Sequence, residues 1–461
     1  MSGQVETAAG LGALDRPSTM RHVLWASMIG TVIEWYDFLI YGTAAALVFN
    51  KLFFPSFDPA TGTLAAFGTY AVGFIARPLG GTLFGHFGDR LGRKTMLMLT
   101  LLITGGGTVL IGCLPTYGQL GFAAPVLLVV LRFVQGIGLG GEWGGAVLMV
   151  VEHAPANRRG LYGSLVQIGF PIGVAASTGI FIPLSAMPAE AFLSWGWRIP
   201  FLVSILLVAV GLFVRMRLSE TPAFQRARQA DTLARRPAWE VITQTPRVFL
   251  IAVGMKISEV AWVYVLTVFA IVYATTRLGL PRPLILNGII AGALLELITL
   301  PLAGWLSDRF GRKPIYLAGV GLSIAAAFPV FWLLDTRDPL VVVAGLALVM
   351  NLTHAIGFGI GAAWMPELFG TRVRYTGASL GCQVSAAISG GFAPIIATAL
   401  LGWAGATWPV SLYLVVLGLV AAIAVLAAKE THRDGIDGEG AFGPVGQGAS
   451  GSIDQSTLRL P

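Results

Sequence analysis

Long apolar segments alternate with short polar segments along almost the whole chain. The apolar segments are roughly 20 residues long or longer, which is the helical length needed to cross a hydrocarbon core about 30 Å thick. The pattern therefore predicts twelve membrane-spanning helices. They lie near residues 22–48, 63–86, 95–114, 124–150, 160–184, 197–217, 248–276, 284–306, 314–334, 340–365, 375–402 and 408–428.

A polar, Arg-rich segment separates the first six predicted helices from the last six. The tail from Lys429 onward is rich in Gly and Ser and has no apolar periodicity, so we expect it to be largely disordered and dispensable beyond Thr431. The predicted units are an N-terminal tail at 1–20, a six-helix bundle at 21–217, a central loop at 218–247, a six-helix bundle at 248–428 and a C-terminal tail at 429–461.

One charged sequence occurs twice, each time between two predicted helices. GHFGDRLGRK at 85–94 returns as GWLSDRFGRK at 304–313, so that Asp89 and Asp308 are 308 − 89 = 219 residues apart, close to half the chain. Such self-similarity indicates a duplicated transporter-like architecture. We predict an all-α integral membrane protein made of two pseudo-symmetric six-helix bundles.

The composition supports a membrane protein. Only 11% of the residues are charged and 55% are hydrophobic, whereas about 25% charged residues are usual in soluble domains. Most loop Arg and Lys residues lie at the end that carries the repeated sequence, which predicts that both termini are cytoplasmic and that the protein resides in the cell membrane. The net charge of +7 does not indicate nucleic-acid binding, because the basic residues lie in short loops.

The repeated loops resemble those of the major facilitator superfamily, and four further segments resemble its metabolite:proton symporters. These segments are Glu34-Trp35-Tyr36-Asp37-Phe38, Arg77-Pro78-Leu79-Gly80-Gly81, GGEWGGA at 140–146 and WGWRIPF at 195–201. The segments at 81–98, 140–145 and 279–282 look especially like shikimate transporters. The resemblance implies alternating access, a monomer and a charge network at the cytoplasmic ends that breaks as the bundles rock apart.

The gating residues follow from the repeated loops and from a second repeat, since Glu152 and Glu367 each precede an Arg by seven residues. An Asp at this place can cap a helix or pair with an Arg across the bundle. The predicted gating residues are Asp89, Arg90, Arg93, Lys94, Glu152 and Arg159 in the first half, and Asp308, Arg309, Arg312, Lys313, Glu367 and Arg374 in the second.

Eight ionisable residues fall inside predicted spans. Each costs about 2.5–3.5 kcal/mol in the centre of an inserted helix, so we expect them to face one another or a water-filled route. Arg77 and Glu296 each stand twelve residues before the motif Asp, about 18 Å into the membrane. The eight are Glu34, Asp37, Arg77, Arg132, Glu142, Lys256, Glu259 and Glu296.

A shift of 219 residues makes Lys256 the equivalent of Asp37 and Glu296 the equivalent of Arg77. Equivalent positions of the two halves therefore carry opposite charges. The same shift pairs Arg132 with Asn351. The predicted substrate-binding residues are Tyr36, Arg77, Arg132, Gln135, Lys256, Glu259, Glu296, Asn351 and His354.

Asp37 and Arg132 are the predicted coupling pair, because protonation of a carboxylate beside an Arg frees the guanidinium for an anion. In proton-coupled sugar relatives, an Asp and an Arg that match these positions form such a pair. Glu34 is the competing proton site. We expect proton symport of a small organic acid, such as shikimate, a dicarboxylate or a keto acid, since cations within the spans favour an anion.

Two alternative functions remain. A zwitterionic osmolyte such as proline or betaine would use an aromatic cage, for which Trp35, Tyr36, Trp143, Trp262 and Tyr264 are available. A non-transporting receptor or sensor on the same fold is the alternative from another class. We expect no enzyme activity, no metal and no cofactor besides the proton, because the sequence has no catalytic triad, metal-ligand spacing or nucleotide-binding loop.

Overall fold

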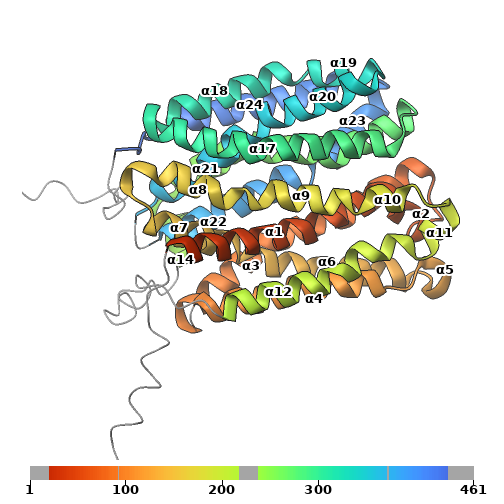
Figure 1. Ribbon diagram of the computed structural model, residues 1–461, viewed down its shortest axis with the longest axis horizontal. Coiled ribbons are helices and arrows are strands. Elements are labelled where there is room, and N and C mark those ends of the chain that lie inside the picture. Colours follow the sequence, from red (N-terminus) through yellow and green to blue (C-terminus); the bar gives the residue numbers. More distant parts are fainter. Residues whose placement is uncertain (1–19, 92, 217–236, 371–372, 434–461) are drawn as a thin grey trace, which may run out of the picture.

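The computed structural model describes residues 20–91, 93–216, 237–370 and 373–433 (Figure 1). Six spans form the N-terminal half, several of them assembled from consecutive helices. They are α1 (Met20–Ala44) with a π-helical turn (Ala45–Phe49) and α2 (Asn50–Leu52), α3 (Pro59–Leu91), α4 (Arg93–Cys113), α6 (Ala123–Gly140) with α7 (Trp143–His153), α8 (Arg159–Gln167) with α9 (Gly169–Gly179) and α10 (Phe181–Ser185), and α12 (Ile199–Met216).

The C-terminal half repeats this order. Its spans are α15 (Pro246–Tyr264) continued by π-helical turns at Val265–Phe269 and Tyr273–Arg277 around α16 (Ala270–Val272), α17 (Arg282–Phe310), α18 (Arg312–Ala326) with α19 (Pro329–Asp335), α20 (Pro339–Met350) with a π-helical turn (Asn351–Ala355) and α21 (Ile356–Leu368), α22 (Arg374–Ser385) with a π-helical turn (Ala386–Gly390) and α23 (Ala393–Ala404), and α24 (Trp408–Ala427). Short helices α5 (Tyr117–Leu120), α11 (Ala189–Ser194) and α14 (Pro237–Gln244) connect spans.

The twelve predicted spans are confirmed as helical segments. Ten helices are long and apolar enough to cross a membrane, and the bent pair α18 and α19, with an angle of 44° between its helices, makes an eleventh. The twelfth is α3, whose 33 residues pack along α6 within the N-terminal half. Its charged and polar end carries the first copy of the repeated loop.

The two halves lie side by side, with the N-terminal half shown in red to yellow-green and the C-terminal half in green to blue (Figure 1). They meet along α8 and α9 against α17, and along α3 against α22. The two contacts are equivalent, because α17 is the second-half counterpart of α3 and α22 is the counterpart of α8 and α9. We call the end that carries the repeated loops the motif end.

The offset of 219 residues between equivalent positions of the two halves holds at the repeated loops and changes after them. Helices α3 and α17 end at Leu91 and Phe310, and both are followed by helices that begin two residues later, so the 219-residue shift is retained. Helices α6 and α20 begin at 123 and 339, a shift of 216. The predicted equivalence of Arg132 and Asn351 is therefore wrong by about one turn, because the connection before α20 is shorter.

Close backbone contact explains the glycines of α6. A Cβ added at Gly140 would overlap the Arg77 carbonyl of α3, and one added at Gly80 would overlap the Ile137 carbonyl of α6. Small residues at such crossings let membrane helices approach closely. The Gly-rich sequence at 136–141 is thus a packing surface between spans.

Candidate functional site

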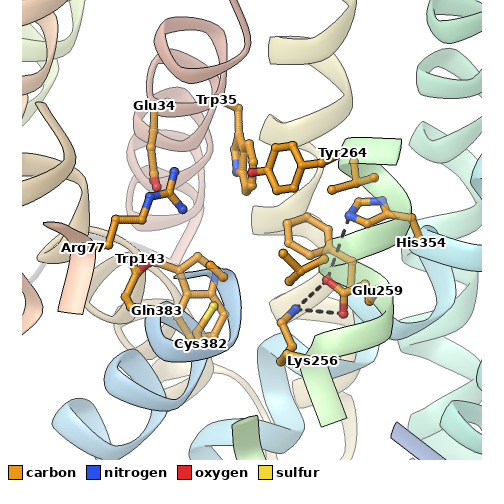
Figure 2. Close-up of a pocket in the computed structure, with 14 residues that line it drawn as sticks. Glu34, Trp35, Arg77, Trp143, Lys256, Glu259, Tyr264, His354, Cys382 and Gln383 are labelled. Atoms are coloured by element: carbon orange, nitrogen blue, oxygen red, sulfur yellow. Dashed lines mark hydrogen bonds and ion pairs between the residues drawn. The ribbon is translucent and has the colours of Figure 1, made fainter. Parts of the chain in front are cut away.

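A small cavity lies between the two halves. Its volume is about 30 Å³, which accommodates about two water molecules but no organic substrate. Five ionisable side chains of the predicted set line it: Glu34 from α1, Arg77 from α3, Lys256 and Glu259 from α15, and His354 from the π-helical turn after α20 (Figure 2). The other lining residues are Trp35, Trp143, Val260, Val263, Tyr264, Phe358, Cys382, Gln383 and Ala386.

Arg77 is the unpaired cation of the cavity. Its guanidinium carbon lies 4.0 Å from the ring centroid of Phe38 and 4.7 Å from that of Phe74, and it forms no hydrogen bond or ion pair with any part of the chain that the structure describes. Glu34 lies on the same side of the cavity and points toward it (Figure 2). The aromatic rings hold this cation by cation–π attraction and leave its N–H donors available to a ligand.

A second guanidinium lies deeper in the same half. Arg132 is fully buried, lies 4.2 Å from the centroids of both Phe38 and Tyr41, and donates to Gln135 at 2.6 Å. Gln135 in turn donates to Thr108 of α4 at 2.6 Å. Phe38 therefore contacts both Arg77 and Arg132, and two positive charges sit around one ring.

Asp37 does not pair with Arg132 in this conformation. Its Oδ1 accepts a 2.5 Å hydrogen bond from Ser204 of α12, while its Oδ2 faces α4 near Gly105 and has no hydrogen-bond partner among the described residues. The predicted direct contact is wrong here because depth along a helix does not fix the direction of a side chain. Thr108 lies beside the Asp37 carboxylate, so Thr108 and Gln135 stand between the two predicted partners.

On the cavity wall formed by the C-terminal half, positive and negative side chains pair with one another. Lys256 Nζ donates to both carboxylate oxygens of Glu259, at 2.7 and 2.9 Å, and His354 Nε2 lies 4.0 Å from Glu259 Oε1 (Figure 2). On its other side, His354 Nδ1 lies 2.8 Å from Glu296 Oε1. Lys256 and Glu259 are three residues apart on α15 and share a face, as their spacing predicts.

Other predicted binding residues point away from the cavity. Tyr36 donates to the Pro200 carbonyl at 2.8 Å, and Asn351 donates to the Gly292 carbonyl at 3.0 Å. Both bonds fasten one span to another, so these side chains have structural roles in this conformation. Gln135 and Arg132 lie behind Phe38, and Glu296 lies behind His354, which places none of them on the cavity surface.

Glu142 is also buried away from the cavity. It lies at the break between α6 and α7 and forms an ion pair with Arg215 near the end of α12. Arg215 also donates to the Leu97 carbonyl of α4. The pair therefore ties together three spans of the N-terminal half. Removing one partner of such a buried pair typically costs about 3–5 kcal/mol.

Contacts between the halves close the cavity at both ends. Away from the motif end, Tyr264 packs against Phe38, Tyr70 and Phe74, with ring centroids 6.0, 5.8 and 5.0 Å away. Toward the motif end, Tyr375 of α22 donates to the Gly141 carbonyl at 2.9 Å. The conformation is occluded, which explains why the cavity is too small for a metabolite.

The second copy of the repeated loop joins the halves directly. Asp308 at the end of α17 accepts the backbone N–H groups of Gly160 and Leu161 at 2.8 Å each, and so caps α8 of the other half. Asp308 also pairs with Arg312 at 2.7 Å, and Arg312 pairs with Glu367 at 3.1 Å. Asp308 thus both caps a helix and pairs with an Arg.

The C-terminal tail is described up to Arg433, and its first residues belong to this network, whereas the prediction was a largely disordered tail from Lys429 onward. Glu430 accepts the backbone N–H groups of Arg312 and Lys313 at 2.9 and 2.8 Å, and Thr431 donates to Glu367 at 2.6 Å. Burial alone would raise the pKa of Glu430, but these backbone donors lower it below its usual value. The rest of the predicted tail lies outside the described residues.

The structure describes the side chains of some of the remaining predicted gating residues and not of others. The side chains of Asp89, Arg90, Arg93 and Lys94 lie outside what the structure describes. In the second half, Arg309 contacts the rings of Trp305 and Phe310, Lys313 donates to the Leu426 carbonyl at 2.6 Å, and Arg374 donates to the Pro366 carbonyl at 3.2 Å. Glu152 is partly exposed and Arg159 is buried at the N-terminus of α8.

The sequence profile of the Major Facilitator Superfamily matches residues 27–390. The chain belongs to this superfamily. The shikimate transporter of Escherichia coli K12 is 44% identical to it over 421 residues, covering 90% of this chain and 96% of the relative. As a member of the superfamily with transporters as its relatives, the chain is a multi-pass membrane transporter.

Two further relatives of this superfamily member are also named as transporters. The inner membrane metabolite transport protein YhjE of E. coli K12 is 41% identical and covers 90% of this chain and 95% of its own. The proline/betaine transporter of the same organism is 33% identical, and the match covers 91% of this chain and 85% of that relative. In fold, the proton:xylose symporter XylE matches with a TM-score of 0.70 at 19% identity, covering 89% of this chain and 96% of that chain.

Several functional contacts of this superfamily member were not predicted from its sequence. Phe38 follows Asp37 directly but gave no signal that it contacts two Arg side chains. Ser204 is one hydroxyl among the apolar residues of α12, and it could have been noticed as the polar residue at the depth of Asp37. Glu430 could have been found as the acidic residue directly after the last span.

Proposed function

We propose that this transporter carries a small organic anion together with a proton by alternating access. The observation that carries the proposal is Arg77, an unpaired cation on the wall of an enclosed cavity between the halves. An Arg can offer two parallel N–H donors to one carboxylate. A small hydroxylated acid such as shikimate fits the likeness to the shikimate transporter.

The charges of the cavity support proton coupling. Glu34 and Glu259 balance Arg77 and Lys256 on its walls, so the empty cavity is formally neutral. A bound anion adds one uncompensated negative charge, which is costly in an enclosed site within a membrane. Uptake of a proton along with the anion restores neutrality.

Asp37 is the proposed proton site of the N-terminal half. Its side chain is fully buried, accepts a hydrogen bond from the Ser204 hydroxyl, and forms no ion pair with any residue that the structure describes. An ionised carboxylate buried without a counter-charge costs several kcal/mol, whereas a protonated one does not. Thr108 and Gln135 connect this site to Arg132, so a change at Asp37 can reach the Arg residues around Phe38.

Reconstituted protein in liposomes with an imposed pH gradient tests the proposal. Uptake of labelled shikimate should follow the gradient and stop when a protonophore removes it. Asp37→Asn should lower uphill uptake by the share that the Asp37 proton drives and retain counterflow. Arg77→Met should raise the half-saturating concentration at least tenfold, whereas Arg277→Met, which removes an exposed Arg outside the cavity, should leave it unchanged. Uphill accumulation by Asp37→Asn equal to the wild type would refute the assignment of Asp37.

A zwitterionic osmolyte is the second candidate, favoured by the aromatic cavity wall. Trp35, Trp143, Tyr264 and Phe358 line the cavity beside Glu34, an arrangement suited to a quaternary ammonium group. Tyr36 and Trp262, also predicted for this cage, do not line it. Separate uptake assays with labelled shikimate, betaine and proline decide between the candidates, since an osmolyte transporter should accumulate betaine and proline and no shikimate.

We also propose the orientation in which the motif end is cytoplasmic, because most loop Arg and Lys residues lie there. Both described chain ends emerge at this side (Figure 1). Protease digestion of a tag attached after Pro461 should occur in inside-out vesicles and not in intact cells.

A further inference from the structure

His354 bridges two carboxylates that belong to different spans. The ring is buried, with Nδ1 2.8 Å from Glu296 Oε1 of α17 and Nε2 4.0 Å from Glu259 Oε1 of α15. Phe170 and Phe358 hold the ring, with centroids 4.5 and 4.6 Å away. The residue lies in a π-helical turn, a local irregularity that is frequent at functional sites.

Glu296 has no other polar partner. It is fully buried, its Oε2 forms no hydrogen bond, and His354 is the one ionisable side chain within ion-pair distance among the described residues. A 2.8 Å contact between a ring nitrogen and a carboxylate oxygen requires a proton between them, because two lone pairs would repel. The pair therefore shares one proton, and it gains a second when either group becomes protonated.

The cavity reaches this pair only through the imidazole. His354 lines the cavity, whereas Glu296 does not. The charged and titratable groups around the ring come from every neighbouring element: Glu296 from α17, Lys256 and Glu259 from α15, Tyr316 from α18, which donates to the Met255 carbonyl, and Glu34, Arg77 and Cys382 across the cavity.

We propose that His354 and Glu296 form a second proton-binding site, in the C-terminal half, which is loaded from the cavity through His354 Nε2. A proton from cavity water binds Nε2, the proton on Nδ1 passes to Glu296 Oε1, and the products are a neutral imidazole and a neutral carboxylic acid. This inference rests on the proposed proton symport, and it adds a proton separate from that of Asp37.

Lys256 and Glu259 connect this site to the substrate. Lys256 occupies both oxygens of Glu259 in the occluded state. A substrate carboxylate that draws Lys256 away would leave Glu259 facing His354 Nε2, where its negative charge favours a proton on that nitrogen. Anion binding and proton uptake on this wall are thereby coupled.

Proton-to-substrate stoichiometry in proteoliposomes tests the site. The steady-state accumulation of a symported acid changes about tenfold per unit of imposed pH gradient for each coupled proton. We expect Glu296→Gln to lose one proton per substrate, and hence about tenfold in accumulation per pH unit, while counterflow persists. Thr299→Val is the matched control, because Thr299 lies on the same helix, bonds to Asn351 of the same π-helical turn and carries no titratable group.

The outcomes separate this inference from the function on which it rests. If wild-type uptake does not respond to the pH gradient, the proposed symport fails. If wild-type uptake responds and Glu296→Gln keeps the wild-type stoichiometry, only the second site fails. Should Glu296→Gln not fold, His354→Gln takes its place, and pH-difference infrared spectra of the wild type supply a second measurement. Absence of a protonated carboxylic-acid band that responds to His354→Gln and not to Thr299→Val would also overturn the proposal.

Discussion

Asp308 holds the two halves together at the motif end, and its removal should open that end by a calculable amount. Its carboxylate accepts the N–H groups of Gly160 and Leu161 of the other half, each at 2.8 Å. Its third contact, with Arg312, lies within its own half. Only the first two contacts are lost when the halves separate, so only they favour the closed state.

The size of the effect follows from these two hydrogen bonds. A hydrogen bond to a charged group contributes about 1.5–3 kcal/mol. Two bonds at the lower value give about 3 kcal/mol, which corresponds to roughly a hundredfold change in the equilibrium between closed and open. Asp308→Ala should therefore raise the open population roughly a hundredfold. Asp308→Asn, which keeps one acceptor oxygen, should have a smaller effect.

Alkylation of Cys382 measures this opening. Cys382 lines the occluded cavity, and Cys113→Ser leaves it as the single thiol of the chain. In detergent-solubilised protein, Asp308→Ala should speed alkylation by a small maleimide in proportion to the open population. The control is Asp338→Ala, since Asp338 accepts the N–H groups of two residues in its own half, at the other end. Equal alkylation rates in the two variants would refute the reasoning.

The remaining predictions concern the tail and the cavity charge. Truncation after Thr431 should preserve transport. Truncation after Ala428 should speed Cys382 alkylation, because it removes the hydrogen bonds from Glu430 and Thr431 to α18 and Glu367; equal alkylation rates in the two truncated proteins would contradict this role of the tail. The stabilisation from Glu430, whose pKa is lowered, is present above the ordinary Glu pKa of about 4.3 and is lost as the pH falls through the lowered value. The melting-temperature difference between wild type and Glu430→Gln should thus shrink as the pH falls below about 4.3. Glu259→Gln should reduce net uptake and retain exchange, measured as counterflow.

The fold could be predicted from the sequence because its two determinants are local. The length of each apolar segment sets the number of spans, and the motif at Asp89 and Asp308 reveals the duplication. The irregular turns inside the spans were not predicted. A π-helical turn such as Asn351–Ala355 inserts one extra residue into an otherwise regular apolar helix, so it leaves the hydrophobic pattern unchanged.

The sequence predicted which charged residues are buried at the candidate site, but not which residues they contact. Burial of a charge in a span indicates an interior position, and Arg77, Lys256 and His354 do line the cavity. Which neighbour each charge contacts depends on helix rotation and on small residues in adjacent spans. Asp37 and Arg132 illustrate this limit, since both are fully buried near Phe38 and yet have separate partners.

The unequal charge of the two walls bears on how such a carrier returns empty. Lys256 and Glu259 pair with each other on the C-terminal wall, whereas on the N-terminal wall Glu34 points toward Arg77 without forming an ion pair among the described residues. The empty cavity is formally neutral, so its closure buries no net charge and the carrier can return without substrate, as a symporter must. Glu259→Gln would leave the empty cavity with a net positive charge, which an anion neutralises without a proton. The same scaffold would then favour exchange over net uptake, so the proposed mode of transport depends on the balance of these four side chains.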